Sequence, residues 1–220
     1  MSAEGGNKEN NNINNKEGKK TVSRRGRGEY TEKKSVFTGT AAPVSTRAEA
    51  DEFVASVRAE FPDARHNVYA YVVSEGNSAR YSDDGEPQGT GGMPVLDVIR
   101  KSGVTDTAIV VSRYFGGILL GAPGLVRAYT AAATAALQDA GIITLRRFAL
   151  CTLTVDYSAY TRLDPSLDRF GVMRDKVDYG EKVSLSLALP AADFDALRAF
   201  VVESTSGKYA PELTGAEEFR

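Results

Sequence analysis

The chain has 220 residues, 42% of them hydrophobic, and a formal net charge of −2 at pH 7. This length and composition suffice for one or two domains with hydrophobic cores. No apolar run approaches the roughly 18 residues that a membrane span requires, and the first residues lack the apolar region of a secretory signal, so a cytoplasmic protein without a membrane partner is expected. The single cysteine, Cys151, lies in an alternating run typical of a strand, which favours a buried thiol over a nucleophile.

Charge is distributed unevenly along the chain. Residues 1–34 carry nine Lys and Arg and five Glu, whereas residues 35–220 carry 18 basic and 24 acidic residues. A net acidic body binds nucleic acid poorly without a local patch, because nonspecific affinity comes from neutralised phosphates. Residues 1–29, rich in Asn, Lys, Glu and Gly, are predicted to form a disordered basic tail. Its cluster Arg24-Arg25-Gly26-Arg27 is either solvated or an RNA contact.

Residues 30–146 are predicted to form one α/β domain. A β-like stretch from Val36 to Thr40 precedes Thr46-Arg-Ala-Glu49, a capping box that opens a helix closed by Pro62. Strands are predicted over 67–74 and 79–82, the second as a possible hairpin partner of the first. A helix after Pro94, a buried strand over 107–112 and a long helix up to Ala140, capped by Gly141, follow.

Residues 147–216 are predicted to form a second domain, with the boundary near Arg146-Arg147. Strand-like patterns cover 148–157, 172–179, 182–189 and 208–213. Helical patterns cover 159–170, interrupted or shifted by Pro165, and a segment from Phe194 to Val201. This βαββαβ order is the ferredoxin-like pattern. The fold class is therefore α+β with two domains.

Two glycine-rich blocks stand out within the first domain. They are Tyr81-Ser-Asp-Asp-Gly-Glu-Pro-Gln-Gly-Thr-Gly-Gly-Met-Pro94 and Arg113-Tyr-Phe-Gly-Gly-Ile-Leu-Leu-Gly-Ala-Pro-Gly-Leu-Val-Arg-Ala-Tyr129. Glycine is favoured where the backbone takes positive φ or approaches another group closely, so the blocks indicate a surface rather than a core. Each block leads into a predicted helix, and the free N–H groups of a helix start favour anions. Neither block has the spacing of a Walker A or Rossmann loop.

Asp83, Asp84 and Glu86 place three carboxylates in one turn around Gly85. A turn of this kind can bind a metal ion, cap backbone N–H groups, or pair with arginines of the second block. The spacing fits no EF-hand loop, and no second cluster of ligands appears, so no metal or cofactor is predicted.

Two arginines of the second block require an anionic partner. Arg127 lies in the first turns of the long helix, where the helix dipole disfavours a cation, and Arg113 ends a predicted buried strand. Either the carboxylates of the first block neutralise them inside the fold, or they bind an external anion. The single histidine, His66, excludes a Ser-His-Asp or multi-histidine site and is expected to be structural.

Aromatic residues flank the glycines of the second block. Tyr114 and Phe115 precede Gly116-Gly117, and Tyr81 opens the first block. These rings either stack on bases or fill a partner's pocket, or they belong to the core. The candidate binding surface therefore consists of Asp83, Asp84, Gly85, Glu86, Arg113, Tyr114, Phe115, Gly116, Gly117, Gly121, Gly124 and Arg127.

The two blocks, together with His66-Asn67 before a Tyr-Ala-Tyr run, resemble the signature of the IMPACT family in its bacterial YigZ-type branch. The resemblance covers roughly residues 30–216 and implies an N-terminal domain with the βαβ fold of ribosomal-protein and translation-factor domains. It also implies a C-terminal domain similar to the last domain of the translocating elongation factor. Two departures bear on the site: Leu119 stands where relatives often carry lysine, and Pro123 where they usually carry glycine.

The resemblance implies a role in translation, because eukaryotic relatives regulate initiation by binding the activator of a stress kinase. We expect a non-catalytic regulator that binds the ribosome, RNA or an RNA-bound factor. A protein-interaction module without RNA contact is the first alternative. An enzyme acting on a small anionic ligand, with the carboxylates facing the arginines, is the second. The sequence does not fix the oligomeric state.

Overall fold

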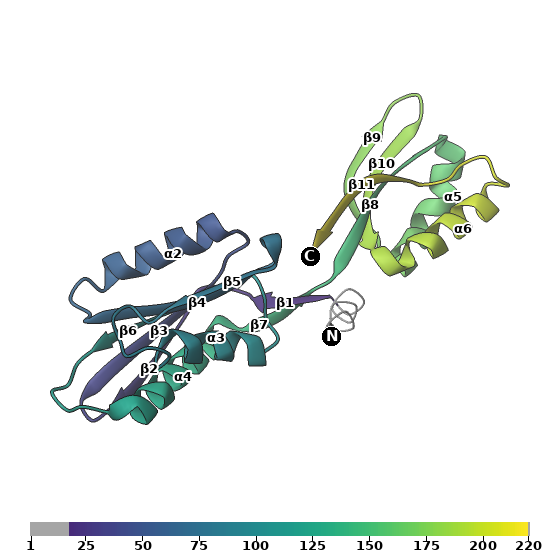
Figure 1. Ribbon diagram of the computed structural model, residues 1–220. Helices are drawn as coiled ribbons and strands as arrows, with labels where there is room; N and C mark the ends of the chain where they lie inside the picture. Colours follow the sequence, from purple (N-terminus) through teal and green to yellow (C-terminus); the bar gives the residue numbers. More distant parts are fainter. Residues whose placement is uncertain (1–17, 220) are drawn as a thin grey trace, which may run out of the picture. The chain divides into compact units, whose positions relative to one another are not determined.

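The structure is a computed structural model that describes residues 18–219 (Figure 1). Its contacts divide the described chain into an N-terminal domain, Lys20–Thr144, and a C-terminal domain that begins at Leu145. The boundary lies two residues before the expected one. In residues 18–219, no helix is both long and apolar enough to cross a membrane.

The N-terminal domain begins earlier than the sequence indicated. Residues 19–29, assigned to a disordered tail, contribute strands, whereas residues 1–17 lie outside the described part of the chain. Arg24 is 3.2 Å from Asp139, and both Arg25 and Arg27 pair with Glu60. This arginine cluster is therefore tied to two helices, which corrects the interpretation as a free tail.

One five-stranded sheet forms the centre of the N-terminal domain, in the order β2-β3-β6-β4-β5 with antiparallel neighbours throughout. Because β3 and β4 both pair with β6 in antiparallel fashion, they run parallel to each other, and the helix between them completes a βαβ crossover. The elements are β1 (Lys19–Val22), β2 (Gly26–Glu32), β3 (Ser35–Pro43), α2 (Arg47–Glu60), β4 (His66–Val73), η1 (Glu75–Asn77), β5 (Ser78–Ser82), α3 (Gly92–Lys101), β6 (Thr107–Tyr114), α4 (Gly121–Ala140) and β7 (Ile142–Leu145). Strands β1 and β7 pair separately.

Helices cover both faces of this sheet. Helix α2 lies on one face, and α3 and α4 lie on the other (Figure 1). The larger core forms under α3 and α4, where Phe37 meets Tyr129 edge to face at 5.1 Å. Gly39 allows α4 to approach β3, because a Cβ there would lie 2.4 Å from the carbonyl oxygen of Ala132.

Local signals read from the sequence are confirmed at both ends of helices. Thr46 accepts a hydrogen bond from the Glu49 N–H at 3.2 Å, and Glu49 in turn accepts from the Ser45 N–H at 2.7 Å. Gly141 follows α4 with φ of 71°, as a glycine C-cap requires. These caps fix where the elements start and end.

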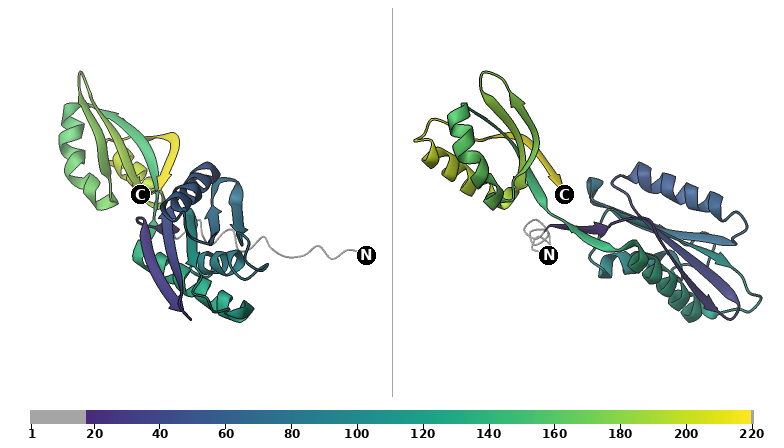
Figure 2. Two further views of the ribbon diagram at one scale, coloured as in Figure 1. Left: turned by 90° about the vertical axis from the view of Figure 1, so that its left-hand side faces the viewer. Right: turned by 180° about the vertical axis from the view of Figure 1, so that it is seen from behind.

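The C-terminal domain has the expected βαββαβ order and a sheet ordered β11-β8-β10-β9, with α5 and α6 on one face (Figure 2). Helix α5 runs through Pro165 without interruption. The last strand starts at Glu212 rather than 208, since Pro211 lacks a ladder donor and Tyr209 is held by Thr205. The elements are β8 (Arg147–Val155), α5 (Tyr157–Leu167), η2 (Asp168–Phe170), β9 (Met173–Tyr179), β10 (Val183–Pro190), η3 (Ala191–Asp193), α6 (Phe194–Ser204) and β11 (Glu212–Phe219).

Candidate functional site

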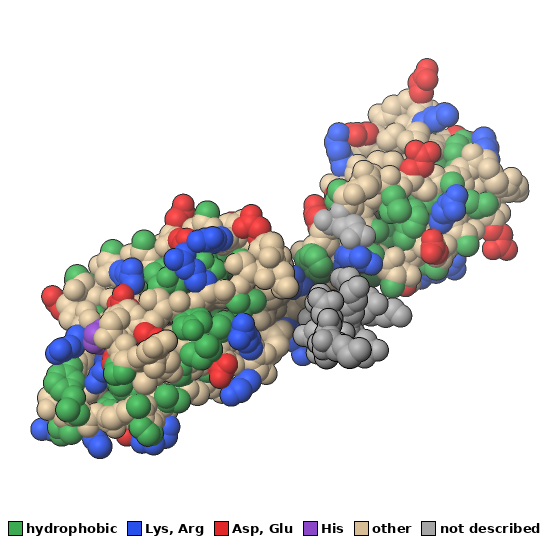
Figure 3. Space-filling view, in the orientation of Figure 1, with side chains coloured by type: hydrophobic (Ala, Val, Ile, Leu, Met, Phe, Trp, Pro, Cys, Tyr) green, Lys and Arg blue, Asp and Glu red, His purple; other side chains and the backbone are tan. Residues whose placement is uncertain are grey.

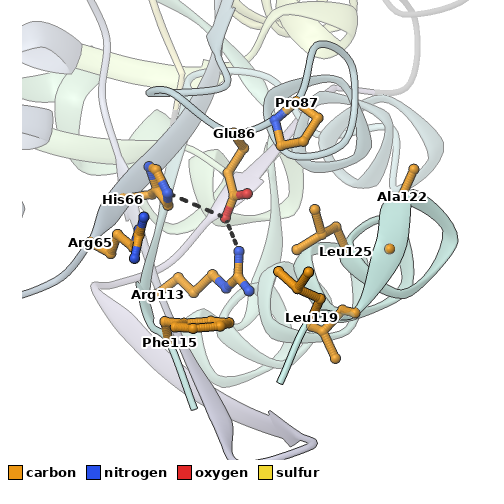
Figure 4. Close-up of a pocket in the computed structure, with 11 residues that line it drawn as sticks. Arg65, His66, Glu86, Pro87, Arg113, Phe115, Leu119, Ala122 and Leu125 are labelled. Atoms are coloured by element: carbon orange, nitrogen blue, oxygen red, sulfur yellow. Dashed lines mark hydrogen bonds and ion pairs between the residues drawn. The ribbon is translucent and has the colours of Figure 1, made fainter. Parts of the chain in front are cut away.

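The two glycine-rich blocks meet at one pocket of about 340 Å³ in the N-terminal domain, which we call the Arg113 pocket (Figure 4). The start of β4, the turn after β5, the end of β6 and the start of α4 each contribute to its walls. The sequence left open whether the blocks face each other, and the structure brings them together. The lining residues are Arg65, His66, Glu86, Pro87, Arg113, Phe115, Leu119, Leu120, Gly121, Ala122 and Leu125.

A buried ion pair joins the two blocks at the base of this pocket. Arg113 Nη1 donates to Glu86 Oε1, and the side chains are only 6% and 3% exposed. The Tyr129 hydroxyl donates to the same oxygen at 2.7 Å, and burial, followed by the Glu86 charge, raises the pKa of this phenol. Glu86 therefore neutralises Arg113 inside the fold, which was one of the two alternatives.

The other two carboxylates of the first block stabilise the backbone around it. Asp83 accepts hydrogen bonds from the N–H groups of Gly91 and Gly92 at 3.0 and 2.8 Å, and thereby caps the start of α3. Asp84 accepts from the Asn67 N–H at 2.7 Å and pairs with Arg58 at 2.6 Å. Within residues 18–219, no group of three or more His, Cys, Asp and Glu side chains is arranged to hold a metal ion.

His66 is fixed by the first block and faces the pocket. Its Nδ1 lies 2.7 Å from the Asp84 carbonyl oxygen, which can only accept, so Nδ1 carries the proton. Nε2 lies 3.9 Å from Glu86 Oε1, beyond hydrogen-bonding distance. The ring thus links β4 to the turn, as the structural role expected from sequence requires.

Arg127 does not join this site. Its Nη2 lies 3.3 Å from Glu32 Oε1, and its side chain is 65% exposed and absent from the pocket walls. The hypothesis that Arg113 and Arg127 form one surface facing the carboxylates is therefore wrong. Arg127 on α4 pairs with Glu32 of β2, whereas Arg113 at the end of β6 pairs with Glu86.

The segment between β6 and α4, residues 115–120, presents apolar side chains to solvent, and we call it the apolar loop. Phe115, Ile118 and Leu119 are 39%, 45% and 82% exposed. In Figure 3, hydrophobic side chains gather at this end of the N-terminal domain beside the single histidine, with Lys and Arg around them. Gly116 permits the loop to lie on the β2–β3 turn, because a Cβ there would lie 2.0 Å from the Lys34 carbonyl carbon.

The remaining candidates divide between loop geometry and packing. Gly85, Gly117 and Gly121 adopt φ of 87°, 83° and 70°, which favours glycine. Gly124 is buried and Tyr114 is half-buried, so neither contributes an open binding group.

Sequence reasoning missed two residues of the site. Arg65 precedes β4, and its guanidinium lies 5.6 Å from the Phe115 ring. Tyr129 ends the second block and was not named as a candidate, although its hydroxyl supplies the third member of the buried cluster. The available signals were an arginine directly before a strand and a tyrosine on a helix face that otherwise carries mostly small residues.

The pocket combines apolar walls with a few polar groups. These are one carboxylate, Glu86, which is already paired, the arginines Arg65 and Arg113, and the ring of His66. Cys151 lies in the C-terminal domain, where burial raises the pKa of its thiol to about 11 and keeps it unreactive.

Comparison with known proteins agrees with this architecture. Residues 33–137 match the model of the Impact N-terminal domain, and residues 153–208 match a domain of unknown function, DUF1949. The chain is 34% identical to IMPACT family member YvyE of Bacillus subtilis over 189 residues, which cover 86% of this chain and 87% of that protein. It is 39% identical to IMPACT family member YigZ of Escherichia coli over 191 residues, covering 84% and 92%.

A solved structure described as the crystal structure of a hypothetical protein has the same fold. It aligns with a TM-score of 0.58 at 34% identity and covers 89% of this chain and 96% of its own. The family models and the relatives agree with the motifs carried by the two glycine-rich blocks. The chain belongs to the IMPACT family and is of the YigZ type.

Proposed function

We propose that this protein is a non-catalytic binding protein of the translation apparatus, and that it docks through the apolar loop on a protein surface of the ribosome or of a ribosome-bound factor. The family resemblance described above supports the link to translation. The observation that supports docking on protein is the exposure of Phe115, Ile118 and Leu119 beside an arginine that is already paired. Apolar side chains exposed together favour a macromolecular partner.

The charge of Arg113 is already neutralised by Glu86 at the base of the pocket, so it offers little attraction to the phosphates of an RNA backbone. Its side chain is 6% exposed and donates to Glu86. Leu119, the most exposed of the large hydrophobic residues described, takes the place of a cation on the same loop. Burying an isoleucine or leucine side chain contributes about 1.5–3 kcal/mol, so a few such residues can anchor an interface.

Direct RNA contact is the second candidate, and a specific observation favours it. Lys33, Lys34 and Arg65 are exposed, and Lys34 lies against the loop at Gly116. Three cations near one loop can neutralise phosphates, and that affinity falls steeply with salt.

Co-sedimentation with ribosomes at about 50 and 200 mM salt separates these readings. Docking by the apolar loop predicts that Ile118→Asp reduces binding about tenfold, whereas Lys33→Ala with Lys34→Ala changes it little and salt has a small effect. The reverse pattern would assign the surface to RNA. Absence of ribosome binding by the folded wild-type protein would refute the proposed place in translation.

A further inference from the structure

The Arg113 pocket contains an incompletely used buried cation. Arg113 is 5% exposed as a residue, and its pair with Glu86 uses Nη1. Nε is buried without a hydrogen-bond partner in the described part of the chain. Buried guanidinium donors are normally satisfied, so Arg113 retains hydrogen-bonding capacity that the fold itself does not use. Figure 4 shows this guanidinium between Glu86 and the apolar wall formed by Leu119 and Leu125.

The start of α4 adds a second, independent anion-binding feature to the same pocket. Helix α4 is 20 residues long, and no side chain of the described chain caps its N-terminus at Leu120. Gly121 and Ala122, in its first turn, line the pocket. Their N–H groups lack partners within the helix, and the helix dipole places partial positive charge there. At α3, by contrast, Asp83 occupies the equivalent position.

Charge and shape together define the ligand class. Arg65 and Arg113 face a single carboxylate, Glu86, so the walls carry an excess of one positive charge before the helix dipole is counted. The remaining walls are mainly apolar, and a volume of about 340 Å³ lies at the lower end of small-molecule pockets. A bare inorganic anion would leave the apolar walls without a partner.

We propose that the Arg113 pocket binds a small organic acid, in which a carboxylate is joined to a short apolar body. The carboxylate contacts Arg65, Arg113 and the first N–H groups of α4, and the apolar body packs against Phe115, Leu119 and Leu125. This inference goes beyond docking, because it concerns a small molecule bound to the isolated protein.

The test is titration of the full chain with 3-phenylpropionate and with its uncharged amide, followed by protein NMR shifts of the pocket residues. We expect saturable binding of the acid with a Kd on the order of 1 mM, which corresponds to about −4 kcal/mol. The amide is expected to bind at least about tenfold more weakly, since it lacks the charge that the arginines recognise. Equal binding of acid and amide, or no saturation by about 10 mM acid, would overturn the proposal.

Two variants make the test specific to the pocket. Arg65→Gln removes an exposed cation of the wall and should weaken acid binding about tenfold, whereas Arg127→Gln, outside the pocket, should leave it unchanged. If Arg65→Gln and Arg127→Gln weakened acid binding equally, the assignment of the acid to the Arg113 pocket would be overturned. Ile118→Asp should weaken docking about tenfold but keep acid binding, because Ile118 does not line the pocket. The two proposals therefore fail separately. A peptide with a free C-terminal Phe bound tenfold more tightly than the acid would assign the pocket to a protein chain end and refute the small-molecule ligand.

Discussion

Arg113 and Arg127 come from the same sequence block, yet their removal should have very different consequences for stability. Arg113→Met keeps most of the side-chain volume beside Phe37 and Phe115 but leaves the Glu86 carboxylate, 3% exposed, without its cation. Breaking a buried pair in this way costs about 3–5 kcal/mol. Arg127→Met removes a pair whose arginine is 65% exposed, and such pairs contribute about 0–1 kcal/mol.

The assay must follow the N-terminal domain by itself, because two domains need not unfold together. Urea unfolding monitored by hydrogen exchange of peptides from β6 and α4 meets this requirement. If Arg113→Met lies within about 1 kcal/mol of Arg127→Met, the pair does not carry the structural role assigned to it.

Two further predictions concern backbone packing and pH. Gly116→Ala should destabilise the N-terminal domain by about 1–3 kcal/mol in urea unfolding, because the new Cβ would lie 2.0 Å from the Lys34 backbone. As a control, Gly180→Ala should change stability by less than about 0.5 kcal/mol, because the nearest neighbour of its Cβ would lie 3.8 Å away. Equal losses of stability in the two variants would contradict the close approach at Gly116. Hydrogen bonds from Lys208 and, next in size, from the Ala159 N–H lower the pKa of Asp156 below its ordinary value of 3.8. The ionised Asp156 therefore stabilises the C-terminal domain fully above pH 3.8, and this stabilisation is lost as the pH falls toward the pKa of Asp156 in the folded state. Asp156→Asn should therefore flatten the loss of stability between about pH 4 and 2, as measured by hydrogen exchange of α5, and an unchanged slope would refute this cause.

Elements with strong local signals could be predicted from the sequence. The capping box at Thr46, the glycine cap at Gly141 and the βαββαβ order of the second domain all depend on neighbouring residues, and the structure confirms them. Residues 19–29 were assigned to a tail because they carry few apolar side chains. Their strands are stabilised instead by pairing with β3 and β7 and by arginine pairs to distant acids, which local composition does not reveal.

The candidate site could be predicted only in part, because its two blocks follow the same pattern. Each is a glycine-rich loop that leads into a helix, and both were interpreted as potential anion sites. In the first block, Asp83 supplies the anion from the chain itself and closes the site. The pairing of carboxylates with donors depends on how β4, β6 and α4 come together in the fold. The spacing of residues within the two blocks does not specify this pairing.

The second block leaves the equivalent position at the start of α4 without a carboxylate from the described chain. Glu86 is close enough to neutralise Arg113, yet it engages Nη1 and leaves the uncapped start of α4 unpartnered by any described side chain. An isolated buried pair stabilises a fold little compared with apolar residues of similar volume. The pair lies at the base of a pocket, beside a second arginine and apolar walls. In the proposed complex with a small acid, it would hold the Arg113 guanidinium in place before the acid arrives and so lower the cost of ordering the site on binding.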